Sequence, residues 1–196
     1  METIRAFIAI PLPHPLLEKL AALQRQLEKQ IPPGSVRWTR AEGIHLTLKF
    51  LGDVPTAQQR DIEQGMAQAS GHHPFTLNAG GLGCFPNFKR PRVVWVGLGG
   101  QMDALHALRD TVERAIAPLG YPTEKRRFNP HLTLGRVKKH ASKADVVDLG
   151  QRLEATEVDA LGQNTVTGIS LIRSQLRPSG AVYTQLSHVK LEGADE

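Results

Sequence analysis

The chain has 196 residues, and its 24 Lys and Arg against 19 Asp and Glu give a formal net charge of +5 and a pI near 9.6. A content of 40% hydrophobic and 22% charged residues excludes a disordered or collagen-like chain. The single cysteine excludes an intramolecular disulfide framework and a thiolate zinc cluster. No stretch approaches the roughly 20 apolar residues of a spanning helix, and no signal peptide is recognisable. We therefore expect a soluble, cytoplasmic, monomeric protein.

The first half of the chain is predicted to fold in the order strand, helix, strand, strand, helix. Leu16, Leu20 and Leu23 begin a series of apolar residues spaced three or four apart, which is typical of one buried helix face. We expect a strand, a helix, two extended segments, a turn and a polar helix at residues 4–10, 16–31, 36–38, 44–51, 52–53 and 56–69.

The second half repeats this rhythm. We expect a strand, a helix, a strand, a helix and two strand-like segments at residues 92–98, 102–116, 131–137, 142–153, 165–176 and 181–191. A turn signal at 177–180 joins the last two segments. Because no low-complexity linker interrupts the chain, we predict an α+β fold of two similar lobes rather than independent domains.

One tetrapeptide, His-Leu-Thr-Leu, occurs twice, at residues 45–48 and 131–134. A chance second copy in a chain of this length has odds on the order of 10⁻³ with ordinary residue usage. Each copy also falls in an equivalent predicted strand. The repeat therefore indicates two related halves that carry the same polar groups.

Side chains alternate between the two faces of a strand, so His45 and Thr47 share one face, as do His131 and Thr133, while the leucines face the core. Two imidazoles near neutral pH can take one proton and give another, and hydroxyls can bind phosphate oxygens without a metal. This suits cleavage of a phosphodiester. The alternative is two ordinary half-buried strand histidines with satisfied hydrogen bonds, which the matched contexts make the weaker interpretation.

Positive charge is concentrated between residues 125 and 144, which include no Asp or Glu. A charge run is usually a solvated surface, but this one surrounds the second tetrapeptide and would give a phosphate an attractive field. The basic residues of this run are Lys125, Arg126, Arg127, Arg136, Lys138, Lys139 and Lys143.

With these motifs the sequence resembles the 2H phosphoesterase superfamily, which is named for two His-x-Thr-x motifs. More narrowly, it resembles the RNA 2′,3′-cyclic phosphodiesterases, or LigT-type 2′-5′ RNA ligase family. The resemblance covers nearly the whole chain, and its segments are residues 5–10, 45–53, 128–136 and 174–183. It implies one bilobal domain over residues 1–196, with two pseudo-twofold-related lobes, each an antiparallel sheet with flanking helices, around a central cleft.

The resemblance also implies roles. His45 would be the acid that protonates the departing 3′ oxygen, and His131 the base that activates water, which leaves a 2′-phosphate. Thr47 and Thr133 would hold the phosphate oxygens. The spacing itself does not decide which histidine is acid and which is base. The resemblance implies no cofactor and no metal ion.

Arg136 matches an arginine commonly found at this place in such sequences, and its forked donors suit a phosphate. Strict alternation from His131, however, puts Arg136 on the leucine face. It can reach the cleft only if the strand bends or ends near Gly135.

Three matters stay open in the sequence. The same site run backward could join RNA ends through a 2′-5′ bond without ATP, and the basic stretch alone fits a non-catalytic RNA-binding module. The partner is expected to be RNA with a 2′,3′-cyclic phosphate end, but tRNA fragments and small cyclic nucleotides present a similar phosphate. Four aromatic residues could stack on bases, although packing is the more common role for each: Trp38, Phe85, Phe88 and Tyr183.

Overall fold

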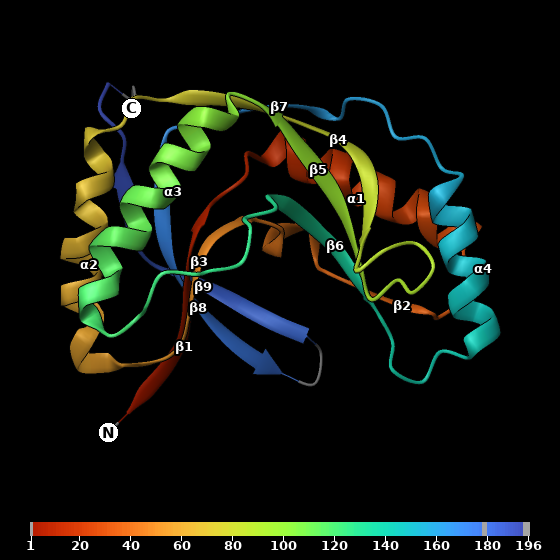
Figure 1. Cartoon of the computed structure of the whole chain (residues 1–196). Helices are drawn as coiled ribbons and strands as arrows, with labels where there is room; N and C mark the ends of the chain where they lie inside the picture. The colour runs from red at the N-terminus through yellow and green to blue at the C-terminus, as the bar shows by residue number, and fades with distance from the viewer. Residues whose placement is uncertain (1, 178–179, 194–196) are drawn as a thin grey trace.

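Two antiparallel sheets form the centre of the protein in the computed structural model, which describes residues 2–177 and 180–193 (Figure 1). The strands are β1 (Thr3–Ile10), β2 (Val36–Trp38), β3 (Leu46–Pro55), β4 (Phe75–Phe85), β5 (Val93–Gly100), β6 (His131–Val137), β7 (Gly162–Val166), β8 (Gly168–Arg177) and β9 (Gly180–Lys190). One sheet has the order β3-β1-β8-β9 and the other β2-β6-β5-β4-β7. The predicted α+β fold with antiparallel sheets is confirmed.

The helices follow the apolar spacing of the sequence. Among the described residues they are α1 (His14–Gln30), α2 (Gln59–Met66), α3 (Met102–Ile116) and α4 (Lys143–Glu154). Each long helix buries one face: α1 buries Leu16, Leu20, Leu23 and Leu27, and α3 buries Leu105, Leu108, Val112 and Ile116. Complete burial of one such side chain contributes about 1.5–3 kcal/mol. None of the helices in the described ranges is long and apolar enough to cross a bilayer.

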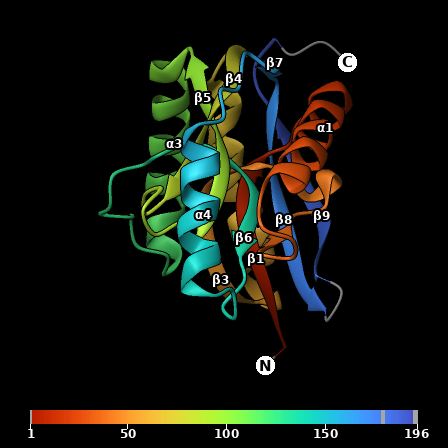
Figure 2. The same ribbon diagram turned by 90° about the vertical axis from the view of Figure 1, so that its right-hand side faces the viewer.

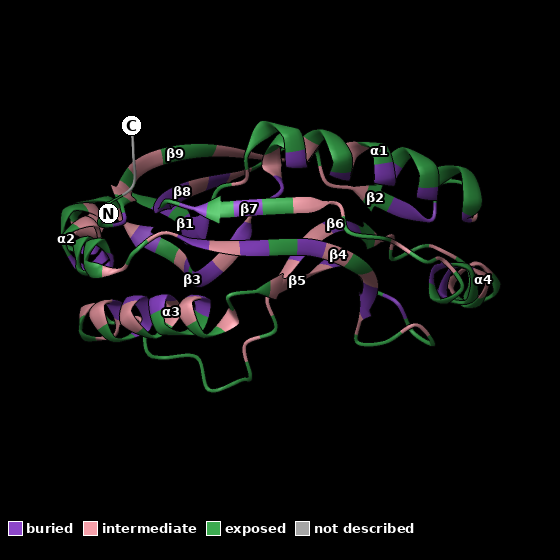
Figure 3. Ribbon diagram, turned by 90° about the horizontal axis from the view of Figure 1, so that it is seen from above, coloured by how far each residue is buried: buried purple, intermediate pink, exposed green. Residues whose placement is uncertain are grey.

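The two halves of the chain exchange elements. β8 and β9, from the end of the chain, pair beside β1, while β2, from its beginning, pairs with β6 at the edge of the other sheet. Likewise α3 packs against β3, and α1 packs against β7 (Figures 1 and 3). Figure 2 shows α4 and α1 from the side of the second sheet. Neither sheet is therefore built from one continuous stretch of chain.

The turn expected at Gly52 and Asp53 is wrong, because β3 continues through both residues to Pro55. Gly52 pairs with Ala6 and has a φ of +73°, and the register shifts between this pair and the next. A glycine in the left-handed region within a strand is typical of a β-bulge. The glycine marks a bulge here, not the end of the strand.

Two further strand expectations were incomplete. The segment 165–176 is not one strand, because β7 ends at Val166 and β8 begins at Gly168, and these strands belong to different sheets. β4 was not predicted at all, although it lies between β5 and β7. Its three glycines and Asn78 are residues that normally interrupt strands. The expected turn at 177–180 includes positions 178–179, which lie outside the described residues.

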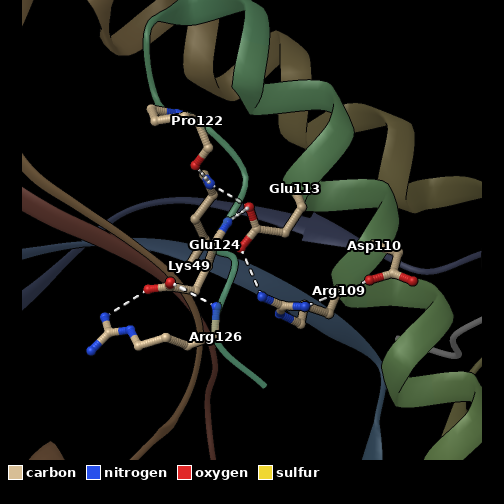
Figure 4. Close-up of polar contacts among 7 residues, drawn as sticks. All are labelled: Lys49, Arg109, Asp110, Glu113, Pro122, Glu124 and Arg126. Carbon is tan, nitrogen blue, oxygen red and sulfur yellow. Dashed lines mark hydrogen bonds and ion pairs between the residues drawn. The ribbon is translucent and has the colours of Figure 1, made fainter. Parts of the chain in front are cut away.

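A buried ionic network connects β3, α3 and the loop that leads into β6 (Figure 4). Lys49 and Glu113 are 5% and 4% exposed and form an ion pair. Lys49 also donates to the Pro122 carbonyl at 3.0 Å, while Arg109 and the Glu124 backbone N–H each donate to the Glu113 carboxylate at 3.2 Å. The network thereby ties the loop before His131 to the strand that carries Thr47.

Removal of one partner of this buried pair is expected to destabilise the protein strongly. In Lys49→Met, the Glu113 carboxylate loses its ammonium partner, and the free energy of unfolding should fall by about 3–5 kcal/mol. The matched control is Arg152→Met, because Arg152 is 53% exposed in its pair with Asp148, and such pairs contribute about 1 kcal/mol or less. Urea unfolding measures both variants; equal losses would contradict the assigned weight of the network.

Candidate active site

The two His-Leu-Thr-Leu segments have the same local environment. His45 immediately precedes β3, and His131 is the first residue of β6. All four leucines are buried, whereas both histidines and both threonines are half-buried. The expected separation of the leucines from the polar side chains is therefore present at both sites.

One cleft of about 590 Å³ brings these four polar residues together. His45 and Thr47 come from the first sheet, and His131 and Thr133 from the second. The cleft therefore lies between the two sheets. Residues 86 positions apart in the sequence face a common space in which one ligand could contact all of them.

Each histidine is oriented by the same hydrogen bond. His45 Nδ1 lies 2.8 Å from the Gly43 carbonyl oxygen, and His131 Nδ1 lies 2.7 Å from the Asn129 carbonyl oxygen. A carbonyl oxygen only accepts, so Nδ1–H is the donor in both rings. This fixes the tautomer and leaves Nε2 of each ring to exchange protons with a ligand.

The surroundings lower the pKa of both histidines below the ordinary value of 6.5. Burial is the main cause for His45; the Gly43 carbonyl opposes it, and the charge of His131 adds to it. For His131 burial again leads, the Asn129 carbonyl opposes it, and the charge of Arg136 lowers the pKa further. Each ring therefore gives up its proton more readily than an exposed histidine does.

Aromatic side chains hold the two imidazoles. Phe7 stacks on His45 with ring centroids 4.4 Å apart, and Tyr183 meets His45 edge-on at 5.2 Å. Phe85 meets His131 edge-on at 4.8 Å. A Cβ at Gly43 would lie 2.9 Å from the Tyr183 ring, so only glycine fits there without displacing the tyrosine. Of the four aromatic candidates from the sequence, Trp38 and Tyr183 line the cleft.

A β-bulge brings Arg136 to the cleft. In the pairing of β5 with β6, Val94 lies opposite Gly135 but Trp95 lies opposite Thr133, so Leu134 is an extra residue. The extra residue shifts the alternation by one position. Arg136 accordingly lines the cleft instead of joining the leucines in the core.

An equivalent bulge follows the first motif. Ile8 pairs with Lys49 but Ala9 pairs with Thr47, which leaves Leu48 as the extra residue. Phe50, five residues after His45, thereby occupies the position that Arg136 occupies after His131, and it also lines the cleft. The sequence analysis did not single out Phe50, although its matching offset from the histidine was a usable signal.

The cleft is strongly basic. Among the described residues that line it, none is Asp or Glu, and five are arginines: Arg5, Arg37, Arg40, Arg136 and Arg177. Four of them lie outside the basic run between residues 125 and 144, and the sequence analysis assigned them no part in binding. From that run only Arg136 lines the cleft, and Lys138, Lys139 and Lys143 line no described cavity.

A second cavity of about 680 Å³ shares Thr47, Phe50 and His131 with the cleft. Arg126 and Arg127 of the basic run line this cavity, together with Phe85 and Phe128. The paired histidine and threonine groups therefore border two openings rather than one.

Other residues weighed in the sequence have structural roles. His72 is half-buried, not exposed as expected, and its Nε2 lies 2.9 Å from the Thr111 hydroxyl. Burial raises the pKa of Cys84 to about 12, so its thiol stays protonated. Within residues 2–177 and 180–193, no three His, Cys, Asp or Glu side chains are grouped closely enough to hold a metal ion.

Comparison with known proteins agrees with this geometry. The chain matches the family described as LigT like phosphoesterase twice, over residues 10–95 and 97–183. It is 33% identical to an RNA 2′,3′-cyclic phosphodiesterase of Methanothermobacter thermautotrophicus over 96% of this chain and 99% of that protein. Another of Aquifex aeolicus is 30% identical, over 98% and 100%.

Solved structures show the same architecture. The E. coli LigT complexed with 3′-AMP superposes with a TM-score of 0.74 at 27% identity, covering 97% of this chain and 99% of that one. The Thermus thermophilus protein TT0787 superposes with a TM-score of 0.78 at 27% identity, covering 97% and 100%. The family match, in two halves that each contain one motif, and the full-length relatives agree: this chain belongs to the LigT-like phosphoesterase family.

Proposed function

We propose that this protein hydrolyses RNA 2′,3′-cyclic phosphate ends to 2′-phosphomonoesters, with His45 and His131 as acid and base. The coarser activity, that of an RNA 2′,3′-cyclic phosphodiesterase and hence a phosphodiester hydrolase, is that of relatives at about 30% identity over the full length. The finer mechanism rests on one observation: two histidines with the same Nδ1–carbonyl hydrogen bond face one cleft that arginines line.

The proposed reaction needs two proton transfers. Neutral His131 accepts a proton at Nε2 from a water molecule, whose oxygen attacks phosphorus. The bond from phosphorus to O3′ breaks, and protonated His45 donates its Nε2 proton to O3′, which leaves the phosphate on O2′. The rings end in exchanged protonation states, and proton exchange with solvent restores them.

Negative charge on the non-bridging oxygens grows during the attack. The Thr47 and Thr133 hydroxyls, half-buried on either side of the cleft, supply hydrogen-bond donors for these oxygens. The Arg136 guanidinium adds a fixed positive charge beside them. Fixed donors and charges are effective because they need no reorganisation as the reaction proceeds. None of these steps requires a metal ion.

A second candidate is the reverse reaction, in which the 5′-hydroxyl of another RNA replaces water and a 2′-5′ bond forms without ATP. The observation that favours it is the second cavity, which borders His131 but not His45. Its lining of Arg126, Arg127 and Phe128 suits a second nucleotide on the side from which the nucleophile approaches. The partners proposed are therefore RNA ends, including tRNA fragments, and small cyclic nucleotides; we propose a monomer as the active form.

Replacement of either histidine tests the mechanism. His45→Asn and His131→Asn should each lower kcat by about 10²-fold or more, because each removes one proton transfer. The assay uses a short RNA with a 2′,3′-cyclic phosphate end in EDTA and resolves the 2′- from the 3′-monophosphate. The matched control is His73→Asn, which alters an exposed loop histidine.

Activity near the wild-type level in either folded variant would rule out the two-histidine mechanism. RNA binding with no product from the wild-type protein would favour the binding module instead.

The pH profile tests the charge environment. Since burial lowers the pKa of both histidines, kcat/KM should be greatest below pH 6.5 and fall as the acid loses its proton at higher pH. Arg136→Gln removes a charge that lowers the pKa of His131, so the limb that His131 controls should move to higher pH. With His131 as the base, that limb is the acidic one.

A shift of the alkaline limb in Arg136→Gln would exchange the two roles. An unchanged profile would mean that Arg136 does not act on the protonation of the pair.

A further inference from the structure

Exposed apolar surface is concentrated at the cleft. Within the described residues, three large hydrophobic side chains are exposed: Phe50, Val147 and Leu176, at 54%, 52% and 75%. Two of them, Phe50 and Leu176, line the cleft between the sheets. Apolar side chains gathered at a ligand cleft mark surface that a bound group covers.

The Phe50 ring is held in place although it is exposed. It lies opposite Phe7 in the pairing of β1 with β3, and the two rings are nearly parallel, with 3° between their planes and centroids 6.1 Å apart. The Arg5 guanidinium carbon lies 4.9 Å from the Phe50 ring centroid. Phe7 itself is buried and stacks on His45. Phe50 therefore extends an aromatic series that begins at the proposed acid.

Phe50 also stands at the right place along the strand. It follows Thr47 by three residues, which is on the order of 10 Å of extended chain, and it borders both cavities that meet at Thr47 and His131. A ribose and its base can span that separation. A planar group on Phe50 would thus be joined to a phosphate held at Thr47.

The two lobes differ at this position. Phe50 and Arg136 are each the fifth residue after their histidine, and both are exposed behind an equivalent bulge. One side of the cleft therefore offers an aromatic face and the other a cation. A nucleotide has the same two ends, a flat apolar base and an anionic phosphate.

We propose that Phe50 is a base-binding residue, on which the base of the nucleotide that carries the reactive phosphate stacks, with Arg5 beside it. Stacking accepts any base, because every base has a π-face. The substrate class that follows is a nucleotide end of any sequence, as opposed to a cyclic phosphate without a base. The assignment rests on the proposed function for the place of the phosphate.

The test compares substrates with and without a base. Phe50→Leu keeps an apolar side chain but removes the ring, so KM for 2′,3′-cyclic AMP and 2′,3′-cyclic UMP should rise between about 5-fold and 150-fold, with little change in kcat. KM for ribose 2′,3′-cyclic phosphate, which has no base, should change less than about 2-fold. Phe50→Trp should restore a low KM for both nucleotides. Val147→Ala, an exposed apolar residue on α4, is the control and should change neither.

A binding measurement separates this proposal from the proposed reaction. Titration calorimetry with 2′-AMP and with inorganic phosphate needs no turnover. In Phe50→Leu, a weaker affinity for 2′-AMP with an unchanged affinity for phosphate would support the stacking role even if the wild-type protein showed no hydrolysis. Equal losses for both ligands, equal KM changes for substrates with and without a base, or no loss for the nucleotides would overturn it.

Discussion

A β-bulge directly after each threonine is the constraint on which the rest of the site depends. Strict alternation sends every second side chain to the core, so a strand that buries Leu46 and Leu48 could present only His45, Thr47 and the residue after Leu48 to the cleft. The extra residue instead buries Lys49 and returns Phe50 to the cleft. The same shift after Thr133 buries Gly135 and exposes Arg136. Each lobe thereby adds a third cleft residue without losing a core residue.

The electrostatic balance of the cleft follows from this arrangement. Burial alone would leave both imidazoles neutral, and the carbonyls of Gly43 and Asn129 oppose it while they fix the tautomer. No carboxylate among the described residues lines the cleft, so nothing there competes with an anion for the arginines. The protonation of the pair is therefore sensitive to the anion itself, since a bound phosphate favours the charged form of a nearby histidine.

Much of the molecule could be predicted from residue patterns, and the parts that could not share a cause. The spacing of apolar residues predicted α1 and α3, and the repeated tetrapeptide predicted which side chains would meet in one cleft. β4 was missed because its glycines resemble a loop, and its strand character comes from pairing on both edges with β5 and β7. The basic run indicated an anion, but most of the arginines at the cleft come from β1, β2 and the end of β8, which only tertiary pairing brings there.

The exchange of elements between the halves explains why a buried ion pair is placed beside the cleft. A proton relay between two lobes requires that the lobes keep a constant separation, because misplacement by about 1 Å can cost on the order of 10²-fold in rate. Lys49 lies two residues after Thr47, and its ammonium binds both Glu113 on α3 and the Pro122 carbonyl in the loop before His131. An apolar pair would bury as well but could not specify that carbonyl. The same strand thus carries a phosphate-binding hydroxyl and the ammonium that anchors the loop leading to the opposite histidine.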